Sequence, residues 1–135
     1  MPQPFGHVLL PEGSLDLPWA GGRDHAVGTC VREHGAKGPG RLVSSAKSWL
    51  CHTGVNRKDP ILPWKAPEGV QQISPVDASS RYLEHLAAAW QGNRGRGLGD
   101  EATVLAVPAS FDAAARDLTI AAAGAAGLRS PVLLE

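Results

Sequence analysis

Lys47 is the side chain whose surroundings most suggest chemistry, because it lies in a stretch of mostly uncharged residues, 43–50. An ammonium group in such a stretch could be directed at a phosphate, where a fixed cation meets negative charge. It could also extend from a partly buried helix so that only its charged end reaches water. Composition favours the second interpretation of Lys47, and the residues alone leave both open.

A metal site is another chemistry that these residue types could support. Its candidate ligands are Cys30, His34, Cys51 and His52. A structural zinc site usually takes its ligands in pairs about two to four residues apart. Cys51 and His52 are adjacent, and adjacent side chains rarely both turn toward one ion. The spacing therefore predicts buried thiols and surface histidines, and no metal.

A glycine-rich tract at residues 92–99 could cradle a phosphate with its backbone amides. A phosphate-binding loop follows a strand and opens a helix. This tract instead follows a predicted helix and precedes a predicted strand. We therefore predict a flexible linker here and no phosphate site.

Pro108 and Arg116 are further candidates, and the residues alone give each a structural role. Pro108 follows an apolar run and predicts the end of a strand. Arg116 lies in an alanine-rich helical stretch, where it is predicted to be solvated and paired with Asp112, four residues earlier.

The elements that position these residues are clearest in the part of the chain from residue 74 to residue 135. Ser74 is predicted to cap a helix that begins with Pro75, and Asp77 completes a capping box. The helix is expected to reach about Gln91. Its predicted apolar stripe comprises Val76, Leu83, Leu86, Ala87 and Trp90.

A strand, a helix and a second strand are predicted to follow. Residues 103–107 and 132–134 are short apolar runs typical of buried strands, and residues 112–126 between them have a helical pattern. Asp112 lies near the start of this helix and Gly127 just past its end. Strand, helix and strand at this spacing predict a parallel βαβ unit and an α/β fold. The predicted apolar face of the helix comprises Phe111, Ala114, Leu118, Ala121, Ala122 and Ala125.

Residues 1–73 are predicted to form an irregular half of the chain, because proline and glycine interrupt it repeatedly. One helix is expected there, at about residues 41–51. The four tryptophans of the chain are interpreted as anchors in the core or at an interface.

Composition excludes some classes of partner. The 135 residues carry 13 basic and 13 acidic side chains, so the zero net charge gives no general attraction to nucleic acid or to an anionic membrane. The two cysteines do not form a disulfide framework. The first residues show no basic region followed by a long apolar run. We therefore expect neither a signal peptide nor a membrane span, and a cytoplasmic location.

Residues 107–116, with the letters V-P-A-S-F-D-A-A-A-R, resemble the V-P-A-x-F-x-x-x-x-R segment of DnaK-type chaperones, the seventy-kilodalton heat-shock family. The resemblance continues at matched spacing to Glu135. A second, weaker match covers residues 45–50, which resemble the segment around the catalytic lysine of that family. Residues 17–64 are similar to a divergent bacterial branch, so the resemblance covers most of residues 12–135.

The resemblance implies an actin-like, ribonuclease-H-like ATPase domain, in which two lobes and two glycine-rich loops hold ATP and magnesium. Hydrolysis in that family switches a separate domain that binds unfolded client proteins, with the help of co-chaperones. By position in the motif, Lys47 matches the catalytic lysine near the γ-phosphate. Pro108 and Arg116 match the proline and arginine that relay nucleotide state to the client-binding domain.

The resemblance therefore implies that residues 1–135 form part of a nucleotide-binding domain, a partial ATPase lobe with a parallel βαβ unit. The first phosphate loop of the family has no counterpart at the start of this sequence, and its catalytic glutamate corresponds to a position beyond Glu135. We expect the chain alone to bind ATP weakly and not to hydrolyse it. Two other hypotheses remain: a non-catalytic α/β binding module, and an unrelated small enzyme that uses Lys47 beside His52 or His85.

Overall fold

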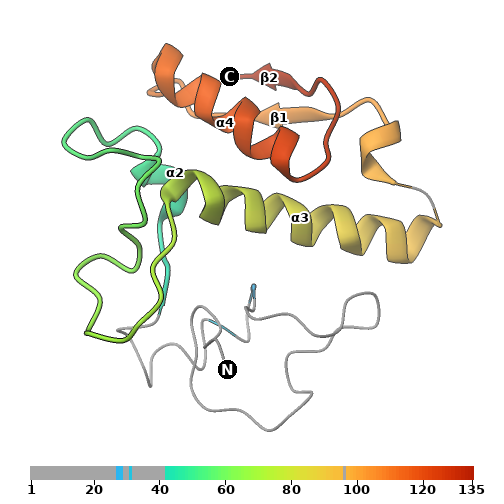
Figure 1. The fold of residues 1–135 in the computed structure, drawn as a ribbon. Helices are drawn as coiled ribbons and strands as arrows, with labels where there is room; N and C mark the ends of the chain where they lie inside the picture. The colour runs from blue at the N-terminus through green and yellow to red at the C-terminus, as the bar shows by residue number, and fades with distance from the viewer. Residues whose placement is uncertain (1–26, 29–30, 32–41, 96) are drawn as a thin grey trace, which may run out of the picture.

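The computed structural model of the chain describes residues 27–28, 31, 42–95 and 97–135. Figure 1 shows the long helix α3 beside a layer formed by α4 and two short strands, with α2 at the amino-terminal end of α3. The elements follow the order α2 (Ala46–Trp49), α3 (Pro75–Arg94), the 3-10 turn η2 (Leu98–Asp100), β1 (Val104–Ala106), α4 (Ala113–Ala125) and β2 (Val132–Leu134).

The βαβ unit is confirmed. Strands β1 and β2 pair in parallel, with Val104 opposite Val132 and Ala106 opposite Leu134, and α4 connects them. The pairing continues past β1, where the Val107 N–H donates to the Leu134 carbonyl oxygen at 2.8 Å. The carboxyl ends of both strands therefore lie at the same edge of the sheet.

The prediction that both strands are buried is wrong. Val104, Val132 and Leu134 are each more than half exposed, whereas Leu105 and Leu133 are partly buried and alternate with them. Side chains in a strand point alternately to opposite faces, so one face of this sheet is covered and the other faces outward. The apolar runs have no period of two, and the sequence therefore could not show that a single face is covered.

Helix α4 begins and ends where the sequence predicts. The Asp112 side chain accepts a hydrogen bond from the Ala115 N–H at 2.8 Å, which caps the first turn. Gly127 has a φ of 87° after the last turn, a conformation that favours glycine. The buried face contains Ala115 and Ala123 with Phe111, Leu118 and Ala122. The predicted members Ala114, Ala121 and Ala125 are exposed instead, because a helix with so many alanines does not define its inner face by residue type.

Helix α3 has the predicted cap, since the Ser74 hydroxyl accepts from the Asp77 N–H at 3.0 Å. The helix is longer than expected and runs through Gly92 to Arg94, ending at Gly95 with a φ of 73°. The tract at 92–99 is therefore not the linker that we predicted. Its first three residues belong to α3, and its last two begin η2.

The predicted apolar stripe of α3 is also only partly correct. Leu86 is 58% exposed, and the buried residues of α3 are Pro75, Ala78 and Ser80 near its amino-terminal end. Val76, Leu83, Ala87 and Trp90 are partly buried.

The helix expected at residues 41–51 is only the single turn α2. Ser45 precedes it with a φ of 56°, which no α-helix accommodates, and Arg41 lies outside the described residues. Residues 42–73 otherwise contain turns and an antiparallel bridge between Leu62 and Ile73.

Two clusters of buried apolar residues meet at α2. The first consists of Leu50, Val107, Phe111, Ala115 and Leu118, with Cys51, Val76 and Leu133 packed against it. The second consists of Ala46, Leu62, Ile73 and Ala78, with Val43, Trp49 and Ile61 packed against it. Ala46 and Leu50 therefore place one helical turn in both clusters.

We expect Gly99→Ala to lower the free energy of unfolding by about 1–3 kcal/mol, the usual cost of overpacking. A Cβ atom at Gly99 would collide with the Gly127 carbonyl oxygen. Gly124→Ala is the matched control, because Gly124 lies in α4 with open space around it, and alanine there should stabilise the helix by about 0.5–1 kcal/mol. Urea unfolding followed by circular dichroism measures both. Equal effects of the two variants would contradict the close approach of η2 to the end of α4.

Candidate functional site

Lys47 lies on an exposed side of α2, and the turn that carries it is fixed by its neighbours. The Arg57 guanidinium donates to the Leu50 carbonyl oxygen at 2.8 Å and so caps the end of the turn. The Arg57 carbonyl oxygen accepts from the Val76 N–H at 3.4 Å, which ties the same loop to α3. The Lys47 ammonium has no ion-pair partner among the described residues. Among the described residues, the position of this cation is therefore set by the backbone of α2 and not by an ion pair of its own.

Pro108 lies in the turn between β1 and α4. The Phe111 N–H donates to the Pro108 carbonyl oxygen at 3.0 Å, so the chain reverses directly after the strand. Val107 and Phe111 on either side are buried, and both pack in the same cluster as Leu50. The turn that carries Lys47 and the turn that carries Pro108 are therefore joined by one apolar contact.

The predicted ion pair between Arg116 and Asp112 is not observed. The Arg116 guanidinium binds the Glu135 carboxylate, with Nη1 2.7 Å from Oε1, because the Asp112 carboxylate caps α4. Glu135 follows β2, and the sequence analysis did not recognise it as the partner of Arg116. The parallel register is the signal that could have found it, because Ala106 lies opposite Leu134 and the next residue, Glu135, therefore comes beside the start of α4.

Pro108, Arg116 and Glu135 thus gather at the carboxyl edge of the two-stranded sheet. This is the edge at which open α/β sheets bind their ligands. The ion pair there is weak, because its side chains are 31% and 58% exposed and water screens their charges. Among the described residues, no ion pair joins Lys47 to these three residues, and the cluster around Leu50 is the link between the two turns.

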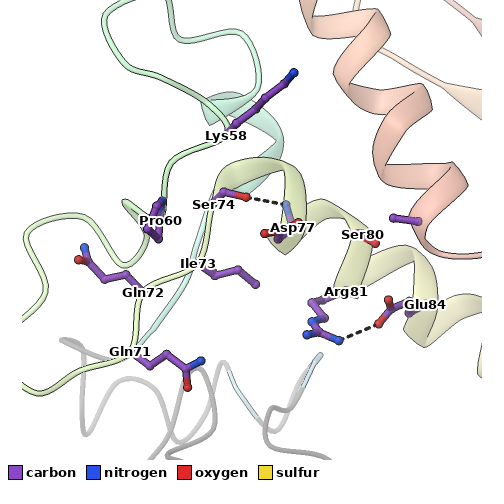
Figure 2. A pocket seen from close by; sticks show the side chains of 11 residues that line it. Lys58, Pro60, Gln71, Gln72, Ile73, Ser74, Asp77, Ser80, Arg81 and Glu84 are labelled. Atoms are coloured by element: carbon purple, nitrogen blue, oxygen red, sulfur yellow. Dashed lines mark hydrogen bonds and ion pairs between the residues drawn. The ribbon is translucent and has the colours of Figure 1, made fainter.

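Two of the cavities lined by described residues are large enough to consider as sites. One, of about 440 Å³, lies against the first half of α3 (Figure 2). The other, of about 350 Å³, lies between residues 55–58 and α4. Lys47, His52 and His85 line neither of these two cavities.

The aromatic residues near α2 form a small stack. The ring of Trp49 stacks on His52 with centroids 4.9 Å apart, and Trp64 lies 5.0 Å from Trp49 at a tilt of 34°. The Gly54 N–H donates to Nδ1 of His52 at 3.1 Å. Trp49 is therefore an anchor of the second cluster, as predicted, whereas Trp64 is half exposed.

The described residues contain no group of three or more His, Cys, Asp or Glu side chains that could hold a metal ion. Cys30 and His34 lie outside the described part of the chain.

Among the described residues, no helix is long and apolar enough to cross a membrane. On α3, burial raises the pKa of Tyr82 above its usual value of 10.0.

Comparison with known proteins gives one informative relative. The chain is 36% identical over 142 aligned residues to the chaperone protein HscA of Edwardsiella ictaluri. The match covers 96% of this chain and 22% of HscA, so the chain spans about a fifth of the length of this relative. The similarity is to one part of a protein whose name describes a chaperone. No protein-family model matches the sequence. No solved structure matches it either.

We expect a double-mutant cycle of Arg116→Gln and Glu135→Gln to give a coupling free energy of about 1 kcal/mol or less, decreasing with added salt, because the pair is partly exposed. Asp112→Ala should cost about 0.5–2 kcal/mol through loss of the helix cap, with almost no coupling to Arg116. Urea unfolding at low and high salt measures all variants. A larger coupling to Asp112 than to Glu135 would contradict the observed pairing.

Proposed function

We propose that this chain is part of the nucleotide-binding domain of a DnaK-type chaperone, a partial actin-like ATPase lobe. In the full-length parent, ATP and magnesium would bind between two lobes, and hydrolysis would control the binding of unfolded client proteins. Co-chaperones would be further partners, and the cytoplasm the location. The observation that carries this proposal is the similarity to HscA along 96% of the chain. HscA is a chaperone by its name.

The arrangement of the three candidate residues agrees with this proposal. We assign Lys47 to the γ-phosphate and Pro108 and Arg116 to a relay of nucleotide state. A relay needs physical continuity between the place of hydrolysis and the residues that report it. The Leu50 side chain supplies such continuity, since it follows Lys47 by less than one helical turn and packs with Val107 and Phe111 on both sides of Pro108.

The described residues fit a nucleotide only in part. Lys47 supplies a cation that no carboxylate among the described residues pairs with, but phosphate binding also needs a cradle of backbone amides or further cations. Neither described cavity is lined by Lys47, and the larger one has as many carboxylates as cations, from Asp77, Glu84, Lys58 and Arg81. The cradle would come from other parts of the parent.

We therefore expect the 135-residue chain, tested alone, to show no saturable binding of Mg-ATP at micromolar concentration. Isothermal titration calorimetry measures this, with Mg-ADP as a second nucleotide. Micromolar affinity for ATP would contradict the assignment of the chain to part of a two-lobed site. It would favour a complete nucleotide site within these residues.

In the full-length parent, Lys47→Ala should lower the rate of ATP hydrolysis about a hundredfold or more, the usual cost of one preorganised charge contact. The negative charge of the transferred phosphoryl group needs fixed cations in the transition state. Arg116→Ala should leave basal hydrolysis intact and weaken its coupling to client release by about 1–3 kcal/mol. Steady-state ATPase assays with and without a client peptide separate the two defects.

Lys65→Ala is the matched control for Lys47→Ala, because Lys65 is also exposed but lies in a different loop, between the bridge residues Leu62 and Ile73. It should leave hydrolysis unchanged. Full turnover by Lys47→Ala, or the same defect in Lys47→Ala and Arg116→Ala, would refute the roles assigned here.

A further inference from the structure

Arg57 is a partly buried cation that contacts the turn carrying Lys47 but has no assigned role in hydrolysis. It lies in the loop that leaves α2 and returns to the start of α3 (Figure 1). Its guanidinium forms no ion pair among the described residues, although the Asp117 carboxylate lines the same cavity. Nη1 instead donates to the Leu50 carbonyl oxygen at 2.8 Å. The charge of Arg57 is therefore directed at the backbone of α2 and not at an acid.

Two hydrogen bonds connect Arg57 to Lys47 through Leu50. The Leu50 carbonyl oxygen accepts from Arg57, and the Leu50 N–H donates to the Lys47 carbonyl oxygen at 3.2 Å. The carbonyl oxygens of residues 45–49 all accept from amides of residues 49–52, at 3.2–3.3 Å. The end of a helix leaves its last carbonyl groups without an internal donor. Arg57 supplies the donor at Leu50 and so completes the hydrogen bonding of the turn.

This bond matters more in α2 than a cap does in a long helix. α2 has four residues, and one turn alone has little stability in water. Ser45 precedes it with a φ of 56°, which is costly for a residue other than glycine. A hydrogen bond from a charged donor is about twice as strong as a neutral one. The turn therefore begins at a strained residue and ends at a charged donor.

The backbone of Arg57 is tied to α3. The Val76 N–H donates to the Arg57 carbonyl oxygen at 3.4 Å, and Val76 lies in the first turn of that 20-residue helix. Val76 also packs against the cluster that contains Leu50. The guanidinium thus extends from a backbone that is fixed to a long helix, and it can keep the short turn in place relative to the rest of the fold.

We propose that Arg57 is a positioning residue for hydrolysis, which fixes the backbone of Lys47 so that the ammonium group meets the γ-phosphate in the transition state. This inference rests on the proposed function, which assigns Lys47 to that phosphate. A misplacement of about 1 Å can cost about a hundredfold in rate, so a lysine on a loosened turn loses much of its effect. Binding of ATP depends on Arg57 much less, because the phosphate cradle would come from other parts of the parent.

The first test measures steady-state ATP hydrolysis by the full-length parent. Arg57→Ala should lower kcat about threefold to thirtyfold, less than Lys47→Ala does, and leave KM for ATP within about twofold. Arg57→Lys should give intermediate turnover, because an ammonium can still donate to the Leu50 carbonyl oxygen. Lys58→Ala is the matched control and should leave kcat unchanged. Lys58 is a cation of the same loop and cavity whose side chain has no hydrogen-bond partner among the described residues.

Arg57→Ala in the Lys47→Ala background separates positioning from a general loss of structure. If Arg57 acts through Lys47, the second substitution should lower kcat by less than about a further twofold, because the group that it positions is gone. Equal fold-losses in the two backgrounds would overturn the proposal.

Amide hydrogen exchange in the 135-residue chain tests the same bond without nucleotide. Arg57→Ala should speed exchange of the Trp49 and Leu50 amides about threefold to thirtyfold, while amides of α4 stay within about twofold. Lys58→Ala should leave all of these amides within about twofold. Arg57→Lys should give a smaller increase confined to α2, which keeps the test decisive if the alanine variant loses its fold. Unchanged exchange at Trp49 and Leu50 would overturn the proposal.

The two levels of inference fail in different ways. Full turnover by Lys47→Ala would refute the proposed function and the role of Arg57 with it. Full turnover by Arg57→Ala, with a large loss in Lys47→Ala, would refute only the role of Arg57.

Discussion

The burial of Leu50 against Val107 and Phe111 is the contact on which the candidate site depends. Helix α2 has four residues, and a helix of one turn has no stability of its own in water. It persists because Leu50 lies in one cluster and Ala46 in the other, while Arg57 caps its end. The position of Lys47 therefore depends on the turn between β1 and α4. Any change that loosens this apolar contact would move the cation without touching it.

The two-stranded sheet, unlike the contact around Leu50, is largely exposed on one side, because one of its faces lacks a second layer in the described residues. Parallel sheets are normally covered on both faces, and small sheets need more strands or more covering helices to be stable. Here Val104 and Val132 lie opposite each other and are about 60% exposed. An exposed apolar face of this kind agrees with the proposal that the chain is part of a larger lobe, since HscA is several times longer than the match. It is also the surface at which the isolated chain is most open to association.

The sequence predicted those features that local signals determine. Ser74, Asp112 and Gly127 have the side chains that begin or end helices, and the apolar runs around α4 defined the parallel pairing. What it could not predict depends on distant contacts. Arg116 meets Glu135 only because two strands pair, and the length of α2 depends on the backbone of Ser45, which its side chain does not reveal. The roles of the candidate residues stay predictions, because they rest on resemblance and not on geometry.

Two interactions near Pro108 differ in strength: the apolar cluster around Leu50 and the ion pair of Arg116 with Glu135. This difference suggests a separate role for each in a relay. The cluster of Leu50, Val107 and Phe111 is buried and close-packed, so it moves as a unit. The pair of Arg116 and Glu135 is partly exposed and worth about 1 kcal/mol or less, so it can break and form at little cost. A relay needs one rigid part to transmit a displacement and one weak part to respond to it. In the proposed function the cluster would transmit the state of the nucleotide, and the ion pair at the sheet edge would be the part that changes.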